Sequence, residues 1–219
     1  MATVVVGGPG KHIGKTALVC GIVAALPEYR WVAVKFTTHD HSLANAEVAG
    51  PFEKKRGDRE AKPASPRKDN IREEMTVGQG TDTARYLAAG AARAFLVTAQ
   101  ANDFPAALAA VRAILDPGPD ASLAPSLGAT ANLIFESNRI LGSLEPDICL
   151  AIHSGTTQPK PSFRLTTRRA DAWVLQEGGA WKLPADEPAV PVFRLKELAR
   201  IPIPMQAWLR ARLGPVRCS

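Results

Sequence analysis

The segment that most constrains the fold of this chain lies between a short apolar run and a helical pattern. Its sequence is VVVGGPGKHIGKT, over residues 4–16. The apolar run predicts a buried strand over Ala2–Val6, and the residues after the turn predict a helix over Lys15–Leu26. Glycines allow successive backbone N–H groups to point at one anion, and a helix N-terminus adds partial positive charge. This strand–turn–helix unit therefore predicts a cradle for phosphate groups.

Apolar, β-branched runs alternate with helical patterns along most of the chain. Because the runs are apolar on both faces, we expect an α/β fold with a mainly parallel sheet flanked by helices on both faces. The further strands are predicted at Trp31–Phe36, Ala94–Thr98, Asn132–Phe135 and Ile148–Ile152, with a candidate at Ala172–Leu175. The further helices are predicted at Thr81–Ala92, Phe104–Leu115, Asn138–Leu144 (a short one) and Pro204–Leu213.

The length and composition favour a single domain over residues 1–219. Hydrophobic residues make up 46% of the chain, which is enough to bury a sizeable core. The segment Phe52–Glu74 interrupts this composition, since it is dense in charged residues and proline and has almost no apolar side chain. We expect it to be a mobile surface insertion that contributes nothing to the core.

The charge balance limits the partners of the chain. The formal net charge is +6, which nucleotide phosphates would satisfy as well as a nucleic acid would. Aromatic residues make up only 6%, and no basic stretch is interleaved with them as in a single-strand binding face. We therefore expect no nucleic-acid partner. No apolar run is long enough to cross a bilayer and no secretory signal is present, so we expect a cytoplasmic protein without a membrane partner.

The glycine-rich turn has a long variant of the P-loop spacing. The pattern GxxxxGK[ST] requires glycine at position 9, where the chain has Pro9, and counting from Gly8 gives a loop one residue longer. This spacing resembles the loop of dethiobiotin synthetase, within the P-loop class that includes MinD-type ATPases. The additional lysine that is typical of MinD-type loops would be at position 10, where the chain has Gly10, so that feature is absent. The alternative is an ordinary glycine-rich turn with a chance Gly-Lys-Thr.

A P-loop assigns specific roles to the residues of the turn. Lys15 is predicted to reach the β- and γ-phosphates of GTP or ATP, and the Thr16 hydroxyl is predicted to hold Mg²⁺. The predicted nucleotide-binding residues are Gly8, Gly10, Lys11, His12, Ile13, Gly14, Lys15, Thr16, Ala17 and, from the next strand, Lys35.

Polar residues at the ends of two later strands extend this predicted site. His39, Asp40 and His41 follow the second strand, and Glu136 closes a later apolar strand. Because strand carboxyl ends face the ligand crevice in a parallel sheet, Glu136 and Asp40 are candidate Mg²⁺ ligands beside Thr16. A solvated turn is the alternative for Asp40, and a position beside a helix N-cap is the alternative for Glu136.

Three elements together resemble the molybdopterin-guanine dinucleotide biosynthesis protein B family, MobB, over roughly the first 150 residues. The family has a Lys-His-Thr-His-His-Asp-like strand end, a Gly-Lys-Asp-Ser/Thr-x-Arg-x-x-x-Ala-Gly-Ala helix and a strand that ends in Glu. The matching residues are Lys35, His39 and Asp40, then Gly80, Asp82, Thr83, Arg85, Ala89, Gly90 and Ala91, and finally Glu136. Phe36 replaces a family histidine, Thr81 replaces the lysine, and Ser137 follows Glu136 where glycine is usual.

The resemblance implies a nucleotide-binding accessory protein of molybdenum-cofactor biosynthesis, with slow hydrolysis and a homodimer that completes the site. Lys15, Asp82 and Glu136 are then the candidate catalytic residues. Two other functions fit the same residues. One is an ATP-dependent synthetase or kinase of the dethiobiotin-synthetase type, which would act on a small molecule. The other is a non-catalytic interaction module in which the P-loop is structural. Besides the nucleotide, the expected partner is an unknown small molecule or protein.

Overall fold

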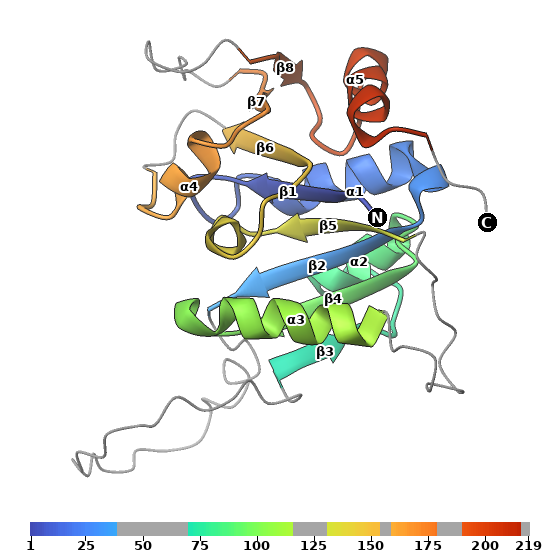
Figure 1. Ribbon diagram of the computed structural model, residues 1–219. Coiled ribbons are helices and arrows are strands. Elements are labelled where there is room, and N and C mark those ends of the chain that lie inside the picture. The colour runs from blue at the N-terminus through green and yellow to red at the C-terminus, as the bar shows by residue number, and fades with distance from the viewer. Residues whose placement is uncertain (39–69, 116–130, 154–158, 179–189, 216–219) are drawn as a thin grey trace, which may run out of the picture.

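The computed structural model describes residues 1–38, 70–115, 131–153, 159–178 and 190–215. Within these residues eight strands form one sheet in the order β3-β4-β2-β5-β1-β6-β7-β8 (Figure 1). Every neighbouring pair is parallel except β3 and β4, which are antiparallel. The predicted mainly parallel sheet is therefore confirmed. The strands are β1 (Thr3–Gly7), β2 (Trp31–Thr37), β3 (Ile71–Glu73), β4 (Arg93–Thr98), β5 (Asn132–Glu136), β6 (Ile148–His153), β7 (Ala172–Gln176) and β8 (Val192–Leu195).

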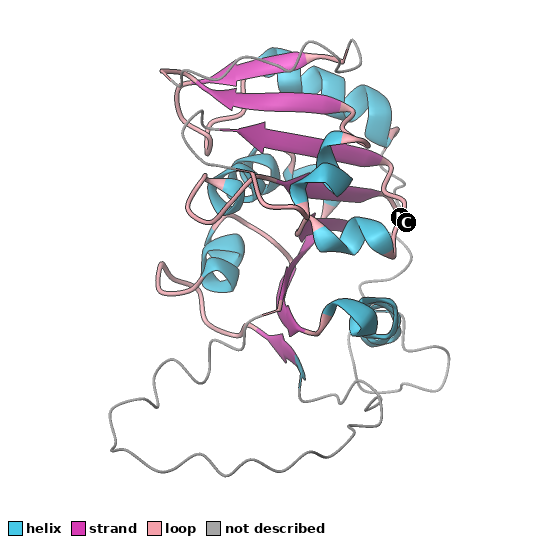
Figure 2. Cartoon of the chain, turned by 90° about the vertical axis from the view of Figure 1, so that its left-hand side faces the viewer, coloured by secondary structure: helices cyan, strands magenta, loops and turns pink. Residues whose placement is uncertain are grey.

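Helices cover both faces of the sheet, as Figure 2 shows. On β1, Val4 and Val6 belong to one apolar cluster and Val5 belongs to another, because successive strand side chains point to opposite faces. The first cluster includes side chains of α1 (Lys15–Ala25), α2 (Asp82–Ala88) and α5 (Ile203–Leu213). The second includes α3 (Phe104–Leu115) and the 3₁₀ turn η6 (Arg139–Gly142). This is the α/β class expected for a P-loop fold.

Two predicted helices differ from the observed elements. The helix expected over Thr81–Ala92 ends at Ala88, and Thr81 is its N-cap, accepting a hydrogen bond from the Ala84 N–H at 3.0 Å. It ends early because Gly90 has a φ of 101°, a left-handed conformation that stops a helix. The helix expected over Asn138–Leu144 is only the 3₁₀ turn η6.

The prediction that Phe52–Glu74 lies wholly outside the core is wrong at its last residues. Residues 52–69 lie outside the described part of the chain. Ile71–Glu73 form β3, which pairs with β4 at the sheet edge, and Ile71 packs against the second cluster. This short strand forms because it hydrogen-bonds to β4. The sequence does not predict it, because the neighbouring residues are mostly charged.

The C-terminal third contains elements that sequence patterns did not predict. The short helix α4 (Phe163–Thr167) connects β6 to β7, and β8 extends the sheet beyond β7. A third apolar cluster, which includes Phe163 and Trp173, packs α4 against β7. Among the described residues, no helix combines the length and the apolar character that a bilayer span requires.

Candidate functional site

The glycine-rich turn joins β1 to α1 at the carboxyl end of the sheet. β1 lies between β5 and β6, with β2 on one side of it and β7 on the other. The turn therefore lies at the topological switch point of the sheet, where ligands of open α/β sheets bind. Two residues have left-handed backbone, His12 with a φ of 59° and Gly14 with a φ of 88°. The loop curves around the Lys15 side chain, whose ammonium donates a hydrogen bond to the Gly10 carbonyl at 2.5 Å. Lys15 thus lies inside the loop, at the N-terminus of α1.

Close packing fixes the start of the turn. A Cβ on Gly8 would lie 2.8 Å from the Ile152 side chain of β6 and would collide with Ile13. The Ile13 side chain is only 3% exposed and belongs to the core cluster of α1. Ile13 therefore anchors the loop to the core, which leaves only its backbone for the predicted contact with a nucleotide.

Asn138 holds the loop from the opposite side. Its amide oxygen accepts a hydrogen bond from the Gly8 N–H at 2.7 Å, and its amide nitrogen donates to the Gly8 carbonyl at 2.8 Å. Thr166 on α4 donates its hydroxyl to the same Asn138 oxygen at 2.9 Å and is fully buried. One side chain thus links the end of β5, the glycine-rich turn and α4.

Two carboxylates converge beside the turn. Glu136, at the end of β5, is only 5% exposed and accepts a hydrogen bond from the Thr16 hydroxyl at 2.7 Å. Asp82, the first residue of α2, is paired with Lys35 of β2. The Lys35 ammonium also lies 3.3 Å from Glu136, so one cation bridges both carboxylates. Arg85 adds a second cation at 3.7 Å from Asp82.

A buried tyrosine completes the surroundings of Glu136. Tyr86 of α2 has no exposed surface, and its hydroxyl donates to the same Glu136 oxygen that accepts from Thr16. Burial and the neighbouring Glu136 charge both raise the pKa of the Tyr86 hydroxyl well above its ordinary value. The tyrosine therefore remains a hydrogen-bond donor across the whole physiological pH range.

The pKa values of the two site lysines are shifted in opposite directions. Burial lowers the pKa of Lys15, and the positive charges of Lys35 and Lys160 lower it further, against the opposing effect of Glu136. Burial would also lower the pKa of Lys35, but Glu136 and Asp82 outweigh it and raise that pKa. Burial would raise the pKa of Asp82, but Lys35 outweighs it and lowers that pKa. Lys35 and Asp82 are therefore a firmly charged pair, whereas Lys15 forms no ion pair with another described residue.

A single cavity of about 690 Å³ brings most of the predicted site together. The predicted site residues that line this cavity are Gly8, Gly10, Lys11, His12, Gly14, Lys15, Thr16, Ala17, Lys35, Asp82 and Glu136. Of the predicted site residues, Ile13 faces the core instead, and Asp40 lies outside the described residues together with His39 and His41. The cavity has the size of a small-ligand site, for which 300–1,000 Å³ is typical.

Sequence patterns missed several residues of this site. Tyr86 and Asn138 act through partners far away in the sequence, and no local pattern marks either role. Phe104, Arg139, Lys160 and Ser162 also line the cavity and come from α3, η6 and the segment that contains α4. Asn138 and Arg139 follow Glu136 closely, so the rule that ligands gather at strand ends could have identified them.

Comparisons with known proteins give one structural similarity. No protein-family model matches the chain, and comparison with curated proteins gives no match. Among solved structures, the chain is similar to LpxK from Aquifex aeolicus, in a structure described as an "apo" form in complex with ATP, at 16% sequence identity and a TM-score of 0.46. The similarity covers 89% of this chain and 53% of that one, so the chain spans about half the length of the structure that it matches.

Proposed function

We propose that the chain binds a nucleoside triphosphate together with Mg²⁺ at the turn between β1 and α1. The observation that carries the proposal is the meeting of Lys15, Thr16 and Glu136 at one cavity, around a loop that encloses the lysine ammonium. A lysine that forms no ion pair within the described part of the chain, at a helix N-terminus and beside backbone N–H groups, is suited to a polyphosphate. Lys15 would exchange the Gly10 carbonyl for the β- and γ-phosphates.

The oxygen donors beside Lys15 fit Mg²⁺. Thr16 supplies a hydroxyl and Glu136 supplies a carboxylate in direct contact with it, and Asp82 lies on the other side of Lys35. Within the described residues, no three metal-ligating side chains of the His, Cys, Asp or Glu type form a cluster. That small donor set suits Mg²⁺, which is commonly held by one or two carboxylates with phosphates and water as the remaining ligands. Bound there, the ion would neutralise charge on the phosphates.

The role of the bound nucleotide follows from the motifs rather than from the fold. We infer a MobB-like accessory protein with slow hydrolysis, supported by the residues that match that family around Lys35, Asp82 and Glu136. In hydrolysis a water oxygen bonds to the γ-phosphorus, and the bond from the γ-phosphorus to the β–γ bridging oxygen breaks. The diphosphate and phosphate leave, and the protons of the water pass to the phosphate and to the solvent. Glu136 is the candidate group to orient that water, because its carboxylate faces the cavity.

A second candidate is an enzyme that uses ATP on a small acceptor. The cavity favours it, since the lining continues past the glycine-rich turn to Thr37 and Thr38 at the carboxyl end of β2 and to Phe104 of α3. These residues lie on the β2 side of Glu136, away from the loop, where an acceptor would have space beside the terminal phosphate. In that case acceptor would accelerate release of diphosphate, whereas an accessory protein would show slow turnover alone.

Calorimetric titration with GTP and ATP, with and without Mg²⁺, tests the proposal. We expect Mg²⁺-dependent binding in the wild type and at least a tenfold loss in Lys15→Ala and Thr16→Ala. Lys196→Ala is the matched control, because this exposed lysine lies outside the cavity lining and should leave the affinity unchanged. A preference for GTP would favour the accessory role, and a preference for ATP would favour the acceptor enzyme. Absence of binding to either nucleotide would overturn the proposal.

A further inference from the structure

A second cavity of about 400 Å³ adjoins the nucleotide cavity on the side away from α1. It lies between the start of α3, η6 and α4, and it shares Arg139 and Ser162 with the larger cavity. Its lining residues are Asn102, Pro105, Arg139, Gly142, Ser143, Ser162 and Leu165. The two cavities are therefore neighbours that share a border at these two residues.

Among the described residues that line the larger cavity, Arg139 differs from the other cations in its position. Six lysines and arginines line that cavity against two carboxylates, Asp82 and Glu136. Lys35 and Arg85 lie beside those carboxylates, while Lys11 and Lys15 belong to the glycine-rich turn and Lys160 donates its backbone N–H to Pro9 of that turn. Arg139 comes instead from η6, after β5.

Arg139 is also an available ligand. It is exposed, and among the described residues its guanidinium makes no hydrogen bond or ion pair. Around it the second cavity presents the hydroxyls of Ser143 and Ser162 and the amide of Asn102, and none of its lining residues is acidic. A guanidinium surrounded by neutral donors matches a planar carboxylate or a phosphate, which it can bind through two parallel hydrogen bonds.

We propose that the second cavity is the binding site for a second ligand, a small molecule that carries a phosphate or carboxylate group held by Arg139. This inference rests on the proposed nucleotide site, because it places the remainder of the ligand beside the terminal phosphate. Arg139 and Ser162 line both cavities, so an anionic group held by Arg139 would lie at the border of the larger cavity.

Nuclear magnetic resonance titration of arginine side chains tests the site with defined probes. The protein is first saturated with Mg²⁺ and a non-hydrolysable triphosphate analogue, and ionic strength is held constant with NaCl. Glycerol 3-phosphate is then titrated in one series and succinate in another. We expect the Arg139 signal, identified by its absence in Arg139→Ala, to shift along a saturable curve for at least one probe. The probe with the lower Kd distinguishes a phosphate from a carboxylate ligand.

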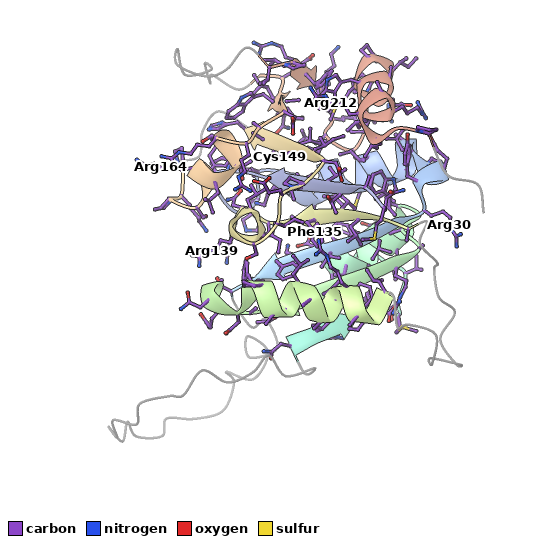
Figure 3. The ribbon with its side chains drawn as sticks, in the orientation of Figure 1. Arg30, Phe135, Arg139, Cys149, Arg164 and Arg212 are labelled. Carbon is purple, nitrogen blue, oxygen red and sulfur yellow. The ribbon has the colours of Figure 1, made fainter. Side chains whose placement is uncertain are left out.

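Two variants make the result specific. With the triphosphate analogue kept at saturating concentration, Arg139→Ala should weaken binding of the preferred probe at least tenfold, measured on the backbone signals of Ser143 and Ser162. Arg164→Ala is the control, since this exposed arginine lies on α4 at the same end of the molecule but lines neither cavity (Figure 3). Equal probe affinity in Arg139→Ala and wild type, or no saturable shift, would overturn the anion site. Failure of the triphosphate itself to bind the wild type would instead overturn the nucleotide site.

Discussion

The side-chain amide of Asn138 is hydrogen-bonded to both polar backbone atoms of Gly8. The amide oxygen lies 2.7 Å from the Gly8 nitrogen, and the amide nitrogen lies 2.8 Å from the Gly8 oxygen. This pair of bonds joins β1 to β5 two residues beyond their last backbone pair, Val6 with Glu136, using a side chain where the strands have ended. Asn138 therefore fixes the first residue of the glycine-rich turn relative to Glu136, which lies two residues before it.

Replacing Asn138 should loosen the turn without removing a ligand. In Asn138→Ala both Gly8 groups and the Thr166 hydroxyl lose a partner, and each unsatisfied buried group costs about 1–3 kcal/mol. We expect at least a tenfold weaker affinity for the triphosphate and a lower free energy of unfolding, measured by calorimetry and urea unfolding. Asn138→Asp can still accept from Gly8 and Thr166 but cannot donate, so it should show an intermediate affinity. Wild-type affinity in Asn138→Ala would contradict a positioning role.

The buried hydroxyl of Tyr86 should contribute to stability through Glu136. A hydrogen bond to a charged group contributes about 1.5–3 kcal/mol, so Tyr86→Phe should lower the free energy of unfolding by roughly that amount. Tyr29→Phe is the matched control, because the Tyr29 hydroxyl donates to the neutral Gly214 carbonyl at 2.9 Å and should cost only about 0.5–1.5 kcal/mol. Urea unfolding of both variants measures the difference. Equal losses would show that the charge on Glu136 adds nothing to the bond.

The main elements around the site could be predicted because their signals are local. The apolar run of β1, the glycine-rich turn and the start of α1 are contiguous, and Glu136 ends an apolar strand. Parallel strands align their carboxyl ends, so the prediction brought Glu136 and Thr16 to one edge, where they are hydrogen-bonded. The helix that begins at Asp82 was also predictable, because its residues match the helix motif of the MobB family.

The residues that sequence reasoning missed depend on contacts between distant segments. Asn138 needs Gly8 and Thr166 as partners, and Tyr86 needs Glu136, and no periodicity encodes such pairings. The strand β3 is short and charged, and it forms because the edge of β4 supplies its hydrogen bonds. Lys35 lines the cavity, as its predicted role near phosphates requires, and it also pairs with Asp82 and Glu136. The sequence did not predict this pairing, because it depends on the register of β2 against β5.

The lowered pKa of Lys15 should make triphosphate binding sensitive to alkaline pH. Binding requires the protonated ammonium, and burial shifts the loss of that proton below the ordinary lysine value of 10.5. A bound polyphosphate stabilises the protonated form of Lys15 and so raises its pKa. Binding therefore takes up a proton at pH values between the pKa of Lys15 in the free protein and its pKa in the complex. Affinity should therefore fall as pH rises through the lowered pKa of Lys15. Calorimetry in buffers of different ionisation enthalpy measures the proton uptake directly.

Lys15→Arg separates this titration from a general effect of alkaline pH. The guanidinium stays protonated at a pKa above about 12, so whatever affinity this variant retains should stay constant over the interval where the wild type weakens. A parallel decline in both proteins would indicate that another group, such as the nucleotide or a second lysine, causes the loss.

Lys35 should compete with a metal ion for the two carboxylates. Lys35→Met leaves Glu136 and Asp82 without their shared cation, which should destabilise the fold because the Glu136 carboxylate is buried. We expect a lower melting temperature without metal and a larger rise on addition of Mn²⁺ than in the wild type, measured by calorimetric scanning without nucleotide. Lys35→Arg keeps the charge and should resemble the wild type. An equal response to Mn²⁺ in Lys35→Met and wild type would contradict the competition.

Gly7 should tolerate no side chain, because the contact between Asn138 and Thr166 passes directly over it. A Cβ there would lie 2.5 Å from the Asn138 amide oxygen and would overlap the Thr166 side chain, and these two groups are held together by their own hydrogen bond. Gly7→Ala should therefore lower the free energy of unfolding by about 1–3 kcal/mol and weaken triphosphate binding, since it displaces the residue that positions Gly8. Gly80→Ala is the control, because nothing lies within 4 Å of a Cβ there and stability should change by less than about 1 kcal/mol. If urea unfolding gave equal stabilities and calorimetry equal affinities for the two variants, the link from α4 through Asn138 to the turn would have no energetic weight.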